Sequence, residues 1–232
     1  MLTVGTDNEG AREAWLKRSL QRIPAGSRIL DAGAGELQFK KYCAHLDYVS
    51  QDFARYDGKG DGAGLHTGEW KHTDLDIVSE ITSIPEPDHS FDAIMCIEVF
   101  EHLPDPLLAV REFSRLLKKD GYLIITAPFC SLTHFAPYHY FSGFNSYFYA
   151  KHLHDHRFAA LEMTSNGNFF EVVAQELRRL DYVAERHARG RISFLERQCL
   201  KVVLAMLQRF SAGDTGSSEL LCHGYNIICK KL

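Results

Sequence analysis

Short apolar runs alternate along the chain with longer segments in which apolar residues recur every three or four positions. The clearest runs lie at 28–30, 48–51, 91–97 and 122–126. Their content of Val, Ile, Leu and Phe is typical of strands buried on both faces. Between them, one helical face is apolar after Asp105, a good N-cap, and we expect this helix to end at Gly121. Strands alternating with helices predict a parallel sheet covered by helices on both faces.

The same periodicities predict the remaining elements. We expect helices at 8–22, 39–45 and from about Asn145, and weaker strands at 74–78, 158–163 and 224–229. Two further helices, at 169–180 and 192–210, are predicted between the last two strands. We therefore expect a single domain over 1–232 with a helical insertion at 165–218.

Composition narrows the class of protein. At 232 residues, with 45% hydrophobic and 24% charged residues, the chain is typical of a globular protein. A formal net charge of −4 argues against a general nucleic-acid-binding protein. Charged residues near the start exclude a signal peptide, and no apolar stretch is as long as a membrane span. The six cysteines show no zinc-like spacing, so we expect reduced thiols and a cytoplasmic protein.

A loop with two glycines follows the first predicted strand. The strand reaches Asp31, Gly33 and Gly35 follow, and a helix is expected behind them. Nucleotide-like ligands bind at this end of an open α/β sheet, where glycine permits a tight turn and a helix N-terminus offers free N–H groups. A dinucleotide-binding loop would need glycine at position 38, where this chain has Gln38. The loop therefore favours S-adenosylmethionine over a nicotinamide dinucleotide.

Two later positions fit an adenosine ligand. Asp52 ends the second predicted strand, where a carboxylate can accept hydrogen bonds from both ribose hydroxyls; the alternative is a turn aspartate that caps the next element. Glu80 can accept from the adenine amino group while Ile81 packs on the base. The glycine-rich segment 57–68 lacks the ending of a P-loop, so we predict a flexible loop there.

Taken together, these motifs resemble those of the class I S-adenosylmethionine-dependent methyltransferases, in the small-molecule group that includes ubiquinone and menaquinone methylases. The matching segments are Asp31-x-Gly33-x-Gly35, Asp52, Glu80-Ile81, Pro85 with Ser90-Phe91-Asp92, Glu98 to Pro106, and Leu116 to Leu123. The resemblance covers roughly residues 28–158. It implies an α/β fold with a Rossmann-like, doubly wound, mainly parallel seven-stranded sheet and an antiparallel last strand. Leu37 departs from the family, which commonly has a third glycine there.

The resemblance also implies roles for individual residues. The residues expected to bind S-adenosylmethionine are Asp31, Gly33, Gly35, Asp52, Glu80, Ile81 and Ile97. Glu98, which follows the fourth strand, would face the methyl group and the acceptor.

Histidines supply the candidates for proton transfer. Methylation of a hydroxyl is helped by a general base with a pKa near neutrality, and the candidates are His102, His134 and His139. A structural histidine that caps the following helix is the alternative for His102. We expect no metal to be required. If a divalent cation is used, its ligands would be Glu98, Glu101, His102 and His139, with His134 as the alternative to His139, since a helical turn from Glu98 would place the first three on one face.

Two segments are candidates for acceptor and partner binding. Residues 129–149 are dense in aromatic side chains and would form either a lid over the acceptor or packing for the helix from Asn145. The insertion at 165–218 would cover the acceptor site, touch a membrane surface or form a dimer contact, with a homodimer expected through the 192–210 helix. A buried helical hairpin with a solvated basic side is the preferred alternative. We expect a methyltransferase acting at oxygen on a small, lipid-like or saccharide acceptor. The rivals are a catalytically silent cofactor-binding protein and, more distantly, a nicotinamide-dependent oxidoreductase.

Overall fold

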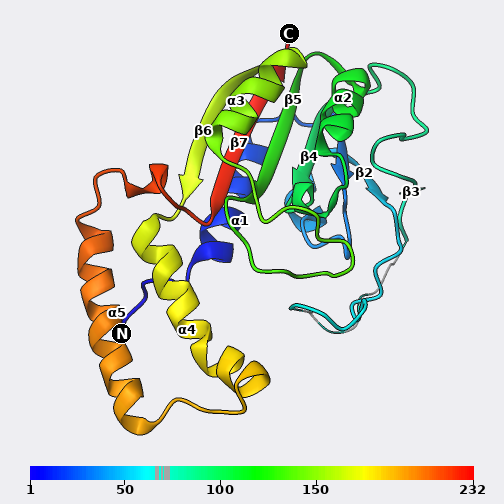
Figure 1. Cartoon of the computed structure of the whole chain (residues 1–232). Helices are drawn as coiled ribbons and strands as arrows, with labels where there is room; N and C mark the ends of the chain where they lie inside the picture. Colours follow the sequence, from blue (N-terminus) through cyan, green and yellow to red (C-terminus); the bar gives the residue numbers. More distant parts are fainter. Residues whose placement is uncertain (66–67, 69, 71–73) are drawn as a thin grey trace. The chain divides into compact units, whose positions relative to one another are not determined.

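The computed structural model describes residues 1–65, 68, 70 and 74–232 (Figure 1). The chain divides into two units. The small unit consists of Met1–Glu13 and Ser165–His223, and the large unit of Ala14–Thr164 and Gly224–Leu232.

A seven-stranded sheet is the centre of the large unit, with strand order β3-β2-β1-β4-β5-β7-β6. The strands are β1 Arg28–Ala32, β2 Asp47–Asp52, β3 Ile77–Val78, β4 Phe91–Ile97, β5 Leu117–Pro128, β6 Phe158–Asn166 and β7 Gly224–Lys231. The pairs β1–β2, β1–β4, β2–β3 and β4–β5 are parallel, and β5–β7 is antiparallel. The predicted fold class is therefore confirmed. Because strand order reverses between β1 and β4, the crevice at their carboxyl ends is where a sheet of this kind binds its ligand.

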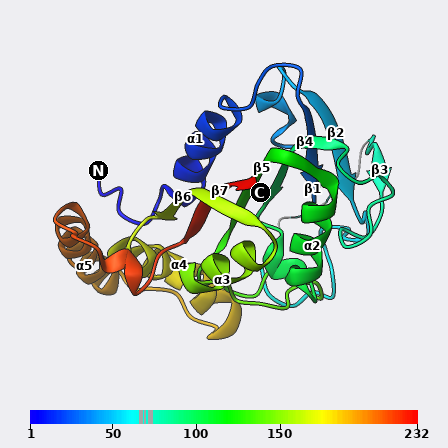
Figure 2. The same ribbon diagram turned by 90° about the horizontal axis from the view of Figure 1, so that it is seen from above.

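Helices cover both faces of the sheet, with α1 (Asn8–Leu20) on one side and α2 (Pro106–Leu116) and α3 (Ser146–Asp155) on the other (Figure 2). From α1, the side chains of Trp15, Leu16 and Leu20 pack against inward-facing residues of β1 and β4 such as Ile29 and Met95. The middle of each central strand is apolar and buried, as expected of parallel strands that have helices on both faces.

Helix α2 begins where the sequence predicts but ends earlier. The Asp105 carboxylate accepts from the N–H groups of Leu107 and Leu108, so the predicted N-cap is confirmed. The helix ends at Leu116, and the expected end at Gly121 was wrong. Leu117 is fully buried and pairs with Phe91 at the start of β5, and its burial in the sheet ends the helix early.

The crossover from β1 to β2 contains no α-helix, so the predicted helix at 39–45 was wrong. A single 3-10 turn at Lys40–Tyr42 takes its place. Leu37 has φ +61°, a left-handed conformation that interrupts any helix started after Gly35. The backbone bonds on either side, from Leu37 N–H to Ala34 and from Lys40 N–H to Leu37, are also three residues apart. The α-helix N-terminus expected behind this loop is thus absent.

The small unit is a helical hairpin formed by α4 (Phe169–His187) and α5 (Phe194–Ala212), followed by the 3-10 turn Ser217–Glu219. Asn168 caps α4, and a reciprocal capping box of Ser193 and Glu196 starts α5. Helix α4 is longer than the predicted 169–180, whereas α5 has the predicted length and begins two residues later than expected. Leu204 and Leu207 of α5 pack with Ala174 of α4 and with Val4. Among the described residues, no helix has both the length and the apolar content needed to cross a bilayer.

Candidate functional site

The glycine loop after β1 is fastened to the end of β2. The N–H groups of Gly33 and Ala34 both donate to the carbonyl of Gln51, each at 2.9 Å. Gly33 has φ +82°, and a Cβ there would lie 2.5 Å from Val99 Cγ2. Glycine is therefore required at position 33 both by the turn and by the close approach of the segment that follows β4.

Asp52 links the same loop to the carboxyl end of β2. Its Oδ2 accepts from the Gly35 N–H at 3.0 Å, and its Oδ1 accepts from the Ala54 N–H at 2.8 Å. The side chain is buried at 7% exposure. Each carboxylate oxygen can accept two hydrogen bonds, and each already accepts one from the backbone. One acceptor site on each oxygen is therefore left for the two hydroxyls of a ribose. The residues present therefore fit an adenosine ribose.

Asp31 lies under the loop at 1% exposure and accepts from the Tyr48 hydroxyl at 2.6 Å. Burial raises the pKa of the Asp31 carboxyl to about 7; the Tyr48 hydrogen bond opposes the rise and the charge of Asp52 adds to it. The carboxyl is thus close to half-ionised at neutral pH.

The remaining predicted adenosine contacts differ in their surroundings. Ile81 and Ile97 are buried, at 7% and 5% exposure, and Ile97 is the last residue of β4. Glu80 is exposed, and its carboxylate lies 2.8 Å from the guanidinium of Arg55. Ile81 and Ile97 thus supply apolar surface, while the Glu80 side chain is engaged in an ion pair.

Glu98 does not belong to a helical turn, so the expected common face with Glu101 and His102 was wrong. Its φ is +56°, and its N–H donates to the Thr126 carbonyl at 2.8 Å because β4 and β5 are still paired there. Its Oε1 accepts from the Thr126 hydroxyl at 2.9 Å. The 3-10 turn begins only at Phe100 and runs to His102.

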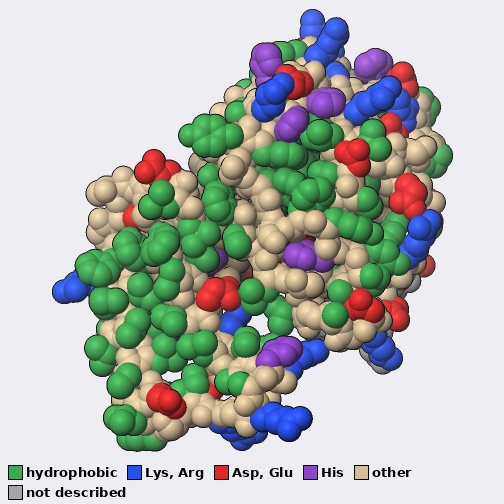
Figure 3. Space-filling model, viewed as in Figure 1, with side chains coloured by type: hydrophobic (Ala, Val, Ile, Leu, Met, Phe, Trp, Pro, Cys, Tyr) green, Lys and Arg blue, Asp and Glu red, His purple; other side chains and the backbone are tan. Residues whose placement is uncertain are grey.

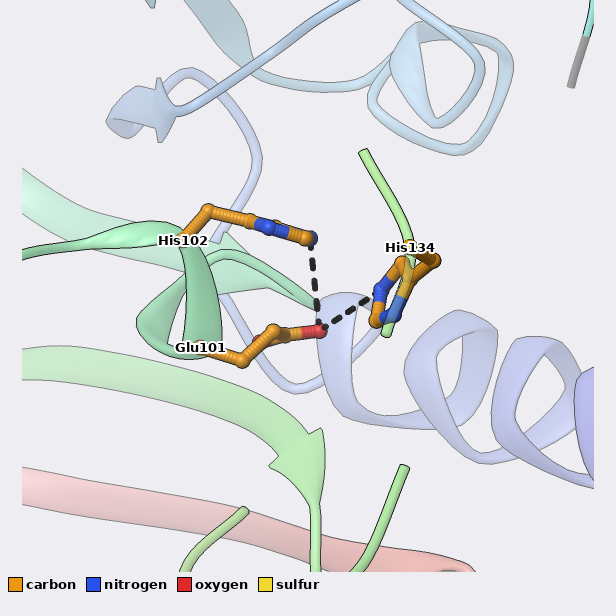
Figure 4. A group of neighbouring side chains, drawn as sticks. All are labelled: Glu101, His102 and His134. Carbon is orange, nitrogen blue, oxygen red and sulfur yellow. Dashed lines mark ion pairs between the residues drawn. The ribbon is translucent and has the colours of Figure 1, made fainter. Parts of the chain in front are cut away.

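The structure instead brings together Glu101, His102 and His134, which we call the Glu101 cluster (Figure 4). The Nε2 atoms of His102 and His134 lie 3.6 and 3.7 Å from Glu101 Oε1. Nδ1 of His102 lies 2.6 Å from the Tyr138 carbonyl, and Nδ1 of His134 lies 2.8 Å from the Leu132 carbonyl. Because a carbonyl only accepts, each Nδ1 carries a proton and each Nε2 of a neutral ring presents a lone pair to the cluster.

Burial and neighbouring charges shift the pKa values of these three groups. It raises the pKa of Glu101, and together with the charge of His134 it lowers the pKa of His102 to about 3. Burial also acts to lower the pKa of His134, but Glu101 and the Leu132 carbonyl outweigh it and raise the value. His102 is therefore neutral at physiological pH, with its Nε2 lone pair available.

The Glu101 cluster is also the group of described residues that could hold a cation. One ligand atom from each member lies within 4.8 Å of the others, and an imidazole whose Nδ1–H is held by a carbonyl is the usual form of a histidine ligand. His139 lies beside the cluster, with its ring centroid 4.8 Å from that of His134, but it is not one of the three grouped residues, and its Nε2 lies 3.2 Å from the Ser131 hydroxyl. The cluster thus lacks one residue of the set expected for a metal, Glu98, and of the two histidines that could complete that set it contains His134 and not His139.

Two loops meet beside these residues, one after β2 and one after β5. The Leu65 N–H donates to the Thr133 carbonyl, and the Phe135 N–H donates to the Leu65 carbonyl. The rings of Tyr56, Trp70 and Phe135 stack edge to face, with centroids 4.7 to 5.7 Å apart. A Cβ at Gly35 would lie 2.7 Å from the Trp70 ring, so this aromatic group also borders the glycine loop. Part of the predicted flexible loop at 57–68, residues 66 and 67, lies outside the described residues.

The sequence pointed to aromatic residues at 129–149 but missed Tyr56 and Trp70. It also missed the backbone of Glu101, whose carbonyl accepts from the N–H groups of Tyr140 and Phe141 at 2.9 and 3.2 Å. These contacts join segments far apart in the chain, and the only local signal for them is the aromatic residues themselves.

The sheet topology, the glycine loop fastened to Asp52 and the turn after β4 define a class I S-adenosylmethionine-dependent methyltransferase. A sequence model of the methyltransferase domain matches residues 7–205, and the chain belongs to this family.

Comparisons with individual proteins agree with this class. The chain is 35% identical to the ubiquinone biosynthesis O-methyltransferase of Xanthomonas axonopodis pv. citri over 106 aligned residues. The aligned segment covers 44% of this chain and 44% of that enzyme. The chain thus spans less than half the length of this curated relative. Among solved structures, a SAM-dependent methyltransferase from Archaeoglobus fulgidus has a TM-score of 0.57 at 18% identity, over 94% of this chain and 92% of that one. A phosphoethanolamine N-methyltransferase of Haemonchus contortus, solved with S-adenosyl-L-methionine, has a TM-score of 0.53 at 18% identity, over 96% of this chain and 52% of that one.

Proposed function

We propose that this protein transfers a methyl group from S-adenosylmethionine to an oxygen atom of an acceptor that is a small molecule, a lipid-like compound or a saccharide. The observation that carries the proposal is the His102 Nε2 atom: it is buried, bears a lone pair and has no hydrogen-bond partner among the described residues. It lies three residues after Val99, which contacts the glycine loop at Gly33. A site for a hydroxyl proton thus adjoins the proposed cofactor crevice.

The cofactor contacts follow from the carboxyl ends of the strands. Asp52 accepts from the ribose hydroxyls, Ile81 and Ile97 pack on the adenine, and the loop from Asp31 to Gly35 lies along the amino-acid part. Glu80, whose Oε1 pairs with Arg55, accepts from the adenine amino group through its other oxygen. When bound, S-adenosylmethionine supplies a methyl group on a positively charged sulfur, which an oxygen nucleophile can displace.

The chain's own part in the reaction is to position the acceptor and to take its proton. His102 is the proposed general base. Because its pKa is low, it does not keep the proton but passes it to Glu101 or to His134, whose pKa is raised. His139 and Glu98 border the same region and would orient the acceptor. Positioning and exclusion of water supply much of the rate for such a transfer, so the reaction itself does not need a metal.

Removal of His102 tests this assignment. His102→Ala should lower kcat by about 100-fold or more, because general-base catalysis contributes about 10² to 10⁴. The affinity for S-adenosylmethionine should be unchanged. The acceptor is first identified by transferring a labelled methyl group into fractionated cell extract and characterising the labelled product. The kcat is then measured with the unmethylated form of that product as the acceptor.

His154→Ala is the matched control, since the His154 side chain is 85% exposed on α3 and should not affect kcat. A His102→Ala protein as active as the wild type would remove His102 from catalysis.

Two further statements belong to the proposal. We place the protein in the cytoplasm, supported by six cysteines that are all free thiols. We also propose a homodimer formed through residues 192–210, supported by the exposed apolar side chains of α5.

A further inference from the structure

The loop after β5 brings His134 to the Glu101 cluster, and it has no acidic or basic anchor of its own. Residues 121–150 contain no Lys, Arg, Asp or Glu. Hydrophobic and histidine side chains lie at the surface over this loop (Figure 3). At its base the loop closes on itself, because the Ser131 N–H donates to the Ser142 carbonyl at 2.6 Å. This bond fixes the base and leaves the tip, which carries His134, to be held by another segment.

That segment is the loop after β2, residues 53–65, which we call the β2 loop. The Leu65 N–H donates to the Thr133 carbonyl at 2.9 Å, and the Phe135 N–H donates to the Leu65 carbonyl at 3.2 Å. Leu65 and His134 are thus paired as in a parallel sheet. Because the two bonds join the neighbours of His134 on both sides, they fix the point from which its side chain reaches the cluster.

The β2 loop also supports His102. Phe53 packs edge to face on the Tyr138 ring, with the centroids 5.1 Å apart, and the Tyr138 carbonyl lies 2.6 Å from His102 Nδ1. At its start the loop is fastened to the proposed ribose ligand, since the Ala54 N–H donates to the Asp52 carboxylate. One segment therefore runs from the cofactor crevice to both histidines of the Glu101 cluster.

We infer that the β2 loop positions these histidines for proton transfer, and that Leu65 is a positioning residue that acts through His134. The inference rests on the proposed function. His134 Nε2 lies 3.7 Å from Glu101 Oε1, so a small displacement of the loop tip would separate His134 from the cluster. The proton taken by His102 would then lose one of its two destinations, while the cofactor contacts would stay in place.

Two glycines of the β2 loop provide a matched pair of variants. Gly64 has φ +76°, and a Cβ there would lie 2.5 Å from the Thr133 carbonyl oxygen, so Gly64→Ala forces the two loops apart. Gly62 has φ +80° and nothing within 4 Å of its Cβ position, so Gly62→Ala carries similar backbone strain without the collision. Hydrogen exchange checks the contact itself: the Leu65 and Phe135 amides should lose protection in Gly64→Ala and keep it in Gly62→Ala.

A double-mutant cycle with His134→Ala tests whether the contact acts through His134. Gly64→Ala should lower kcat by about 10-fold or more, within the roughly 100-fold that a misplaced group can cost, because His134 is displaced. Gly62→Ala should keep the wild-type kcat, and both variants should bind S-adenosylmethionine as tightly as the wild type in calorimetric titration. In the His134→Ala background, Gly64→Ala should cost nothing further.

Leu65→Pro is the second variant, because it deletes the donor to Thr133 without adding the Gly64 collision, and it replaces Gly64→Ala if that protein does not fold. Equal losses of kcat in the two glycine variants, or losses that add fully to that of His134→Ala, would overturn the inference and leave the proposed function intact. So would a fully active His134→Ala protein when His102→Ala is inactive. An active His102→Ala protein would instead remove the proposed function, and the inference with it.

Discussion

A buried carboxyl beneath the glycine loop makes the stability of the protein depend on pH. The pKa of Asp31 is about 7 in the folded chain against an ordinary value of 3.8. Because the folded value is the higher one, ionisation destabilises the fold. The penalty is absent below about pH 4, grows as pH rises and is complete above about pH 7.

Asp31→Asn should therefore stabilise the cofactor-free protein at pH 8 and change little at pH 4. The side-chain oxygen of asparagine still accepts from Tyr48, and about three pKa units correspond to on the order of 4 kcal/mol. Urea unfolding at both pH values measures the difference. Asp47→Asn is the control, since Asp47 is 67% exposed at the start of β2. The quantity compared is the gain in unfolding free energy of Asp31→Asn over the wild type. A gain at pH 8 no larger than the gain at pH 4 would contradict the raised pKa of Asp31.

The site residues that could be predicted from sequence are those fixed by local geometry. Gly33, Gly35 and Asp52 each stand at the end of a strand, where the chain must turn and where parallel strands present their ligands. Trp70 and the carbonyls of Leu132 and Tyr138 could not be predicted, because their roles depend on loops that meet only in the folded chain.

At the scale of elements, the loop after β1 should be intolerant of any side chain at Gly33. Alanine there would both adopt a left-handed φ, at a cost of about 1 to 2 kcal/mol, and collide with Val99. Gly26 has φ +79° but nothing within 4 Å of its Cβ position, so Gly26→Ala carries the backbone cost alone.

We expect Gly33→Ala to lose clearly more unfolding free energy than Gly26→Ala, and Val99→Ala to recover part of the difference in the double variant. Equal losses for the two single variants would show that Val99 does not press on the loop. The measurement is urea unfolding, without cofactor, of five proteins: the wild type, Gly33→Ala, Gly26→Ala, Val99→Ala and the double variant of Gly33→Ala with Val99→Ala.

Helices and strands were predicted correctly where an apolar run or a helix cap in the sequence marked their ends. The N-cap Asp105 and the bounds of β4 were predicted because an apolar run and a helix start are local features. The helix at 39–45 was not found, since the left-handed Leu37 and the short distance to β2 outweigh helix-forming composition. The end of α2 was misplaced because the burial of Leu117 depends on its partner strand.

At the scale of the whole chain, the order of motifs carried more information than any one of them. Strand, glycine loop, second strand and carboxylate in sequence predicted a parallel sheet with a ligand at the carboxyl end of its first strand. The observed sheet agrees, and its strand order reverses between β1 and β4. The last strand, β7, is antiparallel as predicted, and it pairs with β5. The acceptor was not predictable, because a fold of this class serves many substrates.

The most direct test of the account is calorimetric titration with S-adenosylmethionine of the wild type, Asp52→Ala and Asp76→Ala. Asp76 is a matched control: its carboxylate also accepts from backbone and hydroxyl groups of β2, at Ser50, but the proposed cofactor contacts do not include it.

The account predicts one site on the wild type and on Asp76→Ala. Affinity for Asp52→Ala should fall by about 100-fold, since two hydrogen bonds to a charged group, together about 3 kcal/mol, are lost. Binding of NADH in place of S-adenosylmethionine, or an Asp52→Ala protein that is folded and binds as tightly as the wild type, would contradict it.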